Sequence, residues 1–218
     1  MGFYSIVAFF QKGGLFMYPI LLVFAVGLAI SFERWVQLIR VRGSNQKMWD
    51  LLHPVMAKGD FDKARQMVNK DKSSMAQMLG MGLARQGAVR RREDIEIAME
   101  ESMMEIIPQL EKRTPYVALL SNIATLLGLL GTIMGLIEAF TAVANANPAE
   151  KADLLSASIS VAMNTTAFGL MSAIPLLLFH AKLTSTTGQI VDSLEMASVK
   201  ALNTISNFTK RQFDRNSS

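Results

Sequence analysis

The sequence contains three long stretches without a charged side chain. They cover residues 14–32, 114–137 and 154–179, and most of their side chains are apolar. A helix needs roughly 20 consecutive apolar residues to cross the hydrocarbon core of a bilayer. The sequence therefore predicts an all-α membrane protein with three transmembrane helices. The first stretch is interpreted as a retained span rather than a cleaved signal.

Composition gives little support for enzymatic chemistry. The chain lacks cysteine, and its two histidines, His53 and His180, are far apart. Disulfides, thiol nucleophiles and cysteine-ligated metals are therefore excluded. The sequence also shows no carboxylate dyad, no nucleophile paired with a base and no phosphate-binding loop. We expect no enzyme, no cofactor and no metal, and assign no catalytic residue.

Lysine and arginine are distributed unevenly around the three stretches. Most lie in residues 34–113 or after residue 181, whereas the opposite side holds only Lys12 and Lys151. Positively charged loops stay in the cytoplasm, so we predict that the C-terminus lies in the cytoplasm and the N-terminus on the opposite side of the membrane. The arginine run at residues 90–92 belongs to this asymmetry, and no nucleic-acid partner is predicted.

These signals divide the chain into seven segments. We predict a periplasmic interfacial amphipathic helix (1–13), transmembrane helix 1 (14–40), a cytoplasmic helical segment (41–113), transmembrane helix 2 (114–144), a periplasmic loop (145–153), transmembrane helix 3 (154–181) and a cytoplasmic helical tail (182–218). A helix break is expected at residues 43–45, with further interruptions at Gly59-Asp60 and Gly87. Residues 88–110 are expected to form a helix that continues directly into transmembrane helix 2, with bends at Pro108 and Pro115.

Small and hydroxylated residues recur on one face of each of the last two spans. In the second span they are Ser121, Thr125, Gly128, Thr132, Gly135, Ala139 and Ala142. In the third span they are Ala162, Thr166, Gly169 and Ala173, flanked by Ser158, Asn164, Thr165 and Ser172. Such seams occur where membrane helices pack closely, because lipid gives helices no hydrophobic reward for associating.

Two interpretations of these faces stay open. They can pack helices and do nothing else, or they can line a lumen if several copies assemble in a ring. Neither span interior contains an Asp, Glu, Lys or Arg, so a carboxylate for cation transfer would have to come from another chain. Glu138 lies toward the outer end of the second span and is expected to pack at the rim.

Several motifs in and beside the spans resemble the MotA/TolQ/ExbB family of ion-driven membrane motors, nearest to its ExbB/TolQ branch. They are LGLLGTIMG at 127–135, TAFGL at 166–170, AIP at 173–175, GDFDKA at 59–64 and LEKRTP at 110–115. Together with the matching topology, the resemblance covers nearly the whole chain.

The resemblance implies a homopentamer around two copies of an ExbD/TolR-like single-span partner, whose helix supplies an ion-binding Asp. It also implies a place in the inner membrane with a periplasmic N-terminus, and work on a periplasmic or outer-membrane target, with a TonB-like or other envelope protein as a further partner. Thr132 and Thr166 match the pore-facing threonines of the family, with Thr165 beside them. Ser121, Thr125, Ser158 and Asn164 are further lumen candidates. The residues Gly128, Gly131, Gly135, Gly169 and Pro175 are expected to pack helices.

The chain departs from the family pattern at two positions. Many members have a Glu where this chain has Val161, and a Pro where it has Thr125. The Thr165-Thr166 pair is similar to a feature of sodium-driven stators. Neutral oxygen ligands such as these hydroxyls can hold a hard cation. Protons are the expected coupling ion and sodium is the alternative. A sodium-driven stator of a motility-type motor and a non-conducting structural scaffold are the alternative functions.

Overall fold

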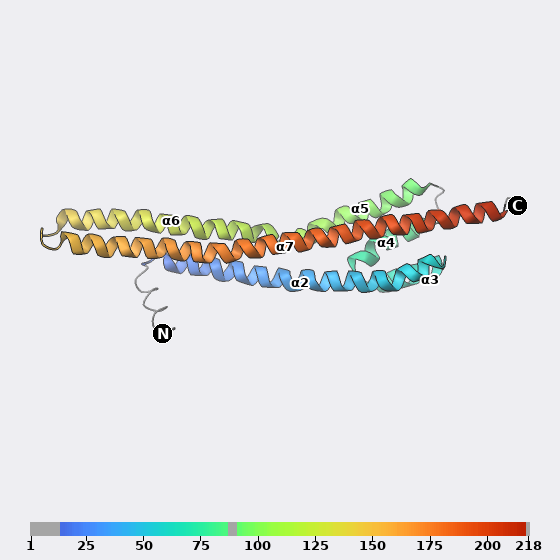
Figure 1. Cartoon of the computed structure of the whole chain (residues 1–218), viewed down its shortest axis with the longest axis horizontal. Helices are drawn as coiled ribbons and strands as arrows, with labels where there is room; N and C mark the ends of the chain where they lie inside the picture. The colour runs from blue at the N-terminus through green and yellow to red at the C-terminus, as the bar shows by residue number, and fades with distance from the viewer. Residues whose placement is uncertain (1–13, 87–90, 217–218) are drawn as a thin grey trace. The chain divides into compact units, whose positions relative to one another are not determined.

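The computed structural model describes residues 14–86 and 91–216, and the regular elements in these parts of the chain are all helices, without a strand (Figure 1). The helices are α2 (Met17–Ala57), α3 (Phe61–Lys70), α4 (Ser74–Arg85), α5 (Arg92–Glu111), α6 (Thr114–Asn145) and α7 (Lys151–Asn216). The predicted amphipathic helix at residues 1–13 and the predicted interruption at Gly87 lie outside the described residues.

Three helical stretches are long and apolar enough to cross a membrane. They are α2, the stretch Arg92–Asn145 that contains α5 and α6, and Lys151–Thr209 within α7. The predicted all-α architecture with three spans is therefore confirmed, and the chain is a multi-pass membrane protein.

The chain divides into two compact units. The first contains Arg113–Leu183 and the described part of Met1–Arg34, and the second contains Trp35–Lys112 and Thr184–Ser218. The helices α2 and α7 contribute residues to both units.

The first unit is built around α6 and the first half of α7, which run antiparallel through a short connection (Figure 1). Its buried core includes Ile20, Ala124 and Ala173, with Phe168 packed against them. Most other large apolar side chains of this unit are exposed. That pattern is typical of a membrane protein, because lipid solvates the outer surface.

The predicted helix break at residues 43–45 is wrong, because α2 runs unbroken to Ala57. Asn45 is buried, and its side-chain oxygen accepts a hydrogen bond from the Met75 backbone N–H at 3.0 Å. It therefore helps to cap the first turn of α4. The buried residues Leu38, Met48 and Leu52 continue one apolar stripe through the break-prone residues, so tertiary packing outweighs their low helix propensity.

The predicted interruption at Gly59-Asp60 is present. Gly59 has a φ of +81°, a left-handed conformation that costs glycine little. The carboxylate of Asp60 then accepts a hydrogen bond from the Lys63 backbone N–H at 3.1 Å and caps α3.

The expected direct continuation of residues 88–110 into transmembrane helix 2 is also wrong. α5 ends at Glu111 and α6 begins at Thr114, and between them Arg113 has a φ of +65°. Pro115 in the first turn of α6 needs no backbone N–H there, so a new helix start is compatible with it. The Arg113 guanidinium donates to both carboxylate oxygens of Glu33, at 2.8 and 2.7 Å.

The second unit consists of α3, α4 and α5 with the second parts of α2 and α7. Its core is rich in methionine and leucine, with Met56, Met78, Met99, Leu79 and Leu194 all buried. The tail after residue 182 is helical, as predicted, and belongs to the same long helix as the third span.

Candidate ion-pathway site

Two glycines bring the backbones of α6 and α7 together. A methyl group placed on Gly128 would lie 3.2 Å from the Cα of Gly169. One placed on Gly169 would lie 2.8 Å from the Ala124 carbonyl oxygen and 2.9 Å from the Gly128 Cα. Side chains do not fit between backbones at these distances, so the small-residue faces of the two helices meet within one chain.

The other predicted packing residues lie along the same helices. A methyl group on Gly135 would lie 2.8 Å from the Ala162 Cβ, and one on Gly131 would overlap the methyl group of Thr165. Pro175 lies inside α7 and is half-buried. It removes a backbone N–H from the helix, so the carbonyl one turn earlier loses its usual donor.

The hydroxyl groups of Thr132 and Thr166 meet just beside this glycine contact. They approach each other from α6 and α7, and both side chains are half-buried. Thr166 donates a hydrogen bond to the Gly128 carbonyl oxygen at 2.8 Å. Thr132 Oγ1 lies 3.3 Å from the same carbonyl oxygen and 3.4 Å from that of Ala162. Four oxygens therefore gather at one point between the two helices.

Counting protons limits which of these hydrogen bonds can form at the same time. Each threonine hydroxyl has one proton to donate and two lone pairs that accept. When Thr166 donates to the Gly128 carbonyl oxygen, Thr132 donates in the contact between the two hydroxyls, and the lone pairs of Thr132 Oγ1 stay available for another donor. When Thr132 instead donates to the carbonyl oxygen of Gly128 or Ala162, Thr166 donates to Thr132.

Thr165 is placed differently from its neighbour. Its side chain is only 2% exposed, and its hydroxyl donates to the Val161 carbonyl oxygen at 3.0 Å. Its methyl group faces Gly131. Adjacent helix positions point about 100° apart, so the Thr165 side chain is buried inside the chain while the Thr166 side chain lies at the half-buried edge of the contact between α6 and α7.

The four additional lumen candidates do not share one environment. Ser121 is buried and donates to the Ala173 carbonyl oxygen at 2.8 Å, whereas Thr125 is exposed and donates to the Ser121 carbonyl oxygen at 3.2 Å. Ser158 and Asn164 are half-buried. The structure thus brings Thr132 and Thr166 together and leaves the other candidates separate from them.

A second small-residue contact was missed by the sequence analysis. Gly27 in α2 lies against Leu176, and a methyl group there would be 2.7 Å from that side chain. The buried hydroxyl of Ser31 donates to the Gly27 carbonyl oxygen at 2.7 Å. The spacing of four between Gly27 and Ser31 was the available signal for this third packing face.

The site holds hydroxyls and carbonyls but no charge of its own. The described residues contain no group of three or more His, Cys, Asp or Glu that could hold a metal ion. Glu138 is exposed near the C-terminal end of α6. The fold and this site define a class of multi-pass membrane protein whose second and third spans meet through glycine and place two threonine hydroxyls in contact.

Comparison with known proteins gives this class a family. Residues 70–196 match the model of the MotA/TolQ/ExbB proton channel family, and the chain belongs to that family. This range contains both threonines and every glycine of the contact between α6 and α7. The resemblance inferred from the span motifs is confirmed.

The relatives extend the match over most of the chain. An ExbB-like biopolymer transport protein of Synechocystis is 30% identical over 190 residues, covering 84% of this chain and 72% of the relative. An ExbB homologue of Methanothermobacter thermautotrophicus is 25% identical over 196 residues, covering 89% and 68%. TolQ of the Haemophilus influenzae Tol-Pal system is 34% identical over 86 residues, covering 39% and 37%. Family and relatives support a role in energy transduction through a proton channel.

Proposed function

We propose that this chain is the ring-forming subunit of an ion-driven motor, which converts the proton motive force into mechanical work together with an ExbD/TolR-like partner. One observation carries the proposal. Thr132 and Thr166 place two hydroxyls beside the Gly128 carbonyl, within the two stretches 114–137 and 154–179 that contain no Asp, Glu, Lys or Arg. Such a site can relay or orient a proton but cannot take one up and release it alone.

The missing carboxylate is the reason for the partner. A hydroxyl donates to a carboxylate and accepts from a carboxylic acid, so it can face the same group in either protonation state. Rotation of the Thr132 and Thr166 hydroxyls would reverse the direction of their shared hydrogen bond. An Asp on the partner's membrane helix would then find a suitable neighbour before and after it loses its proton.

The ring follows from the same requirement. A site at the edge of one chain becomes a pathway only when other helices close it off from lipid. A homopentamer around two partner helices would provide that enclosure, as the family resemblance implies. One charge that crosses 100 mV yields about 2.3 kcal/mol, so sustained work on an envelope protein needs several ions.

The inner membrane and a cytoplasmic second unit are part of the proposal. The cytoplasmic position is supported by the excess of lysine and arginine in residues 34–113 and after residue 181, and the inner membrane by the family resemblance. The transported or mechanically driven target would depend on the partner's outer domain.

Sodium is the alternative coupling ion. Two hydroxyl oxygens and two carbonyl oxygens resemble the ligands of a hard cation. The buried position of Thr165 weakens this reading, because its oxygen is turned toward Val161 rather than toward Thr166.

A non-conducting scaffold is supported by a different observation. The glycines of the small-residue faces already have a packing role within one chain, and the family's usual Glu is replaced by Val161. A scaffold would tolerate loss of the threonine hydroxyls, provided that their volume is kept.

The experiment that tests the proposal is native mass spectrometry of this chain, co-expressed with its genomic neighbours and purified in mild detergent. We expect a homopentamer that retains two copies of a small single-span protein with a membrane Asp. A stable assembly without such a partner would contradict the motor and favour the scaffold.

A further inference from the structure

We propose that a groove between α2 and α7 in the second unit binds the acidic outer face of α5 from a second copy of this chain. The inference deepens the proposed function and rests on it, because it names the surfaces through which the copies of the ring would join.

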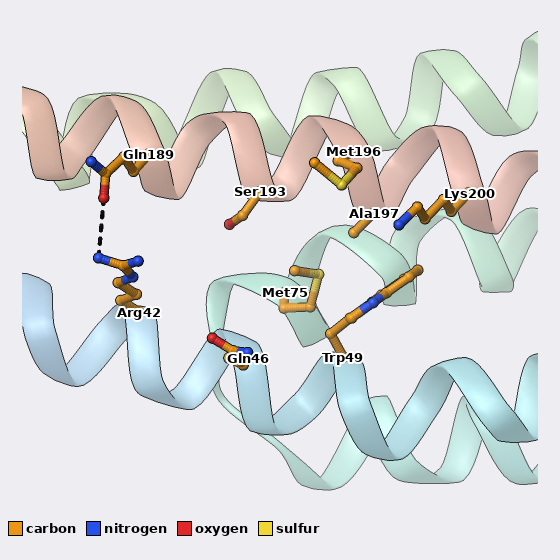
Figure 2. Close-up of a pocket in the computed structure, with 9 residues that line it drawn as sticks. All are labelled: Arg42, Gln46, Trp49, Met75, Gln189, Ser193, Met196, Ala197 and Lys200. Carbon is orange, nitrogen blue, oxygen red and sulfur yellow. Dashed lines mark hydrogen bonds between the residues drawn. The ribbon is translucent and has the colours of Figure 1, made fainter.

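The groove is a cavity of about 230 Å³ whose apolar floor includes Trp49, Met75 and Met196. Figure 2 shows Trp49 projecting from α2 toward α7, with Met75 of α4 between the two helices in this view. Met196 is 57% exposed although it lines this cavity. An apolar hollow in a part of the chain predicted to lie in water is a candidate binding surface.

The charged side chains that line the groove are all positive. Arg42 and Lys200 are both exposed, and no Asp or Glu is among the described residues that line the cavity. The Arg42 guanidinium donates to the Gln189 side-chain oxygen at 3.1 Å, which orients the guanidinium without neutralising it (Figure 2). The groove therefore suits an apolar ligand flanked by carboxylates.

The outer face of α5 has the complementary character. Its centre is formed by Ile97 and Met104, which are 51% and 71% exposed, and by exposed Pro108. Their spacings of seven and four keep them on one side of the helix. Carboxylates border this stripe at the exposed residues Glu93, Glu100, Glu101 and Glu105. Within α5, Arg92 is the single basic residue against seven acidic ones.

The groove and the acidic face of α5 also lie at the same level along the helix axes. Arg92 donates to the Asn203 side-chain oxygen at 2.9 Å, and Ser198 donates to the Met99 sulfur at 3.7 Å. α5 and α7 are therefore antiparallel, with Ile97 at about the level of Lys200 and Met104 at about the level of Ser193. Seven residues rise about 10.5 Å in a helix, which matches the stretch of groove between Ser193 and Lys200.

In a ring, the groove of one copy and the α5 face of the next copy stay at the same level along the helix axes. Copies related by rotation about an axis parallel to the helices keep each residue at the same height. The acidic face and the groove are different surfaces of the second unit, so their contact is heterologous, and such a contact forms a ring when the rotation between copies closes. The occupant is thus a second copy, with the apolar stripe of α5 in the groove and its carboxylates near Arg42 and Lys200.

The absence of cysteine from the chain allows a direct test. Two differently tagged copies, one Met104→Cys and one Ser193→Cys, are co-expressed with the partner, and membranes are treated with a short thiol cross-linker. We expect a cross-linked product that carries both tags and no such product from either variant alone. Adding Glu101→Lys to the Met104→Cys copy should reduce the yield of this product about fivefold. Adding Lys200→Glu to the Ser193→Cys copy should then restore the yield.

Glu195→Lys is the matched control, since it makes the same charge change at an exposed α7 residue outside the groove lining. A multi-copy complex without the Met104–Ser193 cross-link would overturn the inference and leave the proposed motor standing. Failure to form any multi-copy complex would contradict both. A co-purifying anionic phospholipid that is lost from an Arg42→Gln, Lys200→Gln variant, without the cross-link, would assign the groove to lipid instead.

Discussion

At the scale of single residues, the hydroxyl pair depends on glycine. Thr132 and Thr166 can touch because Gly128 and Gly169 allow the backbones of α6 and α7 to approach closely. Gly128 also supplies the carbonyl oxygen that accepts from Thr166. The packing and lumen interpretations of the small-residue faces are therefore compatible, since glycine packing creates the geometry in which two hydroxyls meet.

The first prediction concerns this packing. Gly169→Ala places a Cβ 2.8 Å from the Ala124 carbonyl oxygen, and a backbone atom cannot move aside cheaply. We expect a loss of about 1–3 kcal/mol in the free energy of unfolding, seen as a lower Tm in detergent.

Gly188→Ala in the same helix is the control. A Cβ at Gly188 meets nothing within 4 Å, so the higher helix propensity of alanine should stabilise the helix by roughly 0.5–1 kcal/mol. Equal effects of the two substitutions would show that the close approach of α6 and α7 is not needed for stability.

The sequence could predict which residue types form the site but not which way each one faces. Ser121 and Thr125 belong to the same predicted face, yet the first is buried and the second exposed. Thr165 and Thr166 are adjacent, yet only Thr166 meets Thr132. Periodicity defines a face about 100° wide, whereas the division between packing and edge positions depends on how the two helices are rotated.

At the scale of elements, Arg113 separates α5 from α6. Its left-handed backbone conformation costs an L-residue roughly 1–2 kcal/mol relative to glycine. The ion pair with Glu33 offsets part of this cost, but both side chains are about half exposed, at 49% and 48%, so the pair contributes only about 0–1 kcal/mol.

The second prediction separates these two contributions. Arg113→Gly and Arg113→Ala both remove the ion pair, but only glycine relieves the strained backbone. We expect Arg113→Gly to be more stable than Arg113→Ala by about 1 kcal/mol, or about 2–4 °C in Tm.

Glu33→Gln serves as the control, because it removes the ion pair and leaves the residue at the left-handed position unchanged. Its Tm should fall only slightly. If glycine and alanine at Arg113 gave the same Tm, the left-handed conformation would carry no cost.

Helix boundaries were only partly predictable. The uncharged stretches identify all three spans, because burial in lipid imposes length and composition on a helix. The residues 43–45 look like a break, yet α2 continues because buried Asn45 caps α4 and the apolar stripe continues on both sides. That information is tertiary, and it lies thirty residues away in the sequence.

At the scale of the whole molecule, the orientation in the membrane is the first proposal to test. The third prediction uses single cysteines in the cysteine-free chain, at Asn147 and at Gln77, which are both exposed. In intact cells an impermeant thiol reagent should label Asn147→Cys and not Gln77→Cys, because only the first is expected to lie outside the cytoplasm.

Permeabilised cells provide the control, since both variants should then react. Labelling of Gln77→Cys alone in intact cells would invert the orientation, and the second unit would face the periplasm.

The measurement that tests the motor most directly is ion flux through the purified complex in vesicles. With this chain and its partner present, a membrane potential should drive proton uptake, read from a pH-sensitive dye in sodium-free buffer. Thr166→Val should abolish the uptake while the native mass spectrum of the complex stays unchanged, because valine keeps the volume of threonine and removes its hydroxyl. Thr141→Val, which loses an exposed hydroxyl bonded only within α6, should conduct normally. If the flux required sodium, sodium and not the proton would be the coupling ion. Full proton flux through the Thr166→Val complex would contradict the assignment of the threonine pair to the ion pathway.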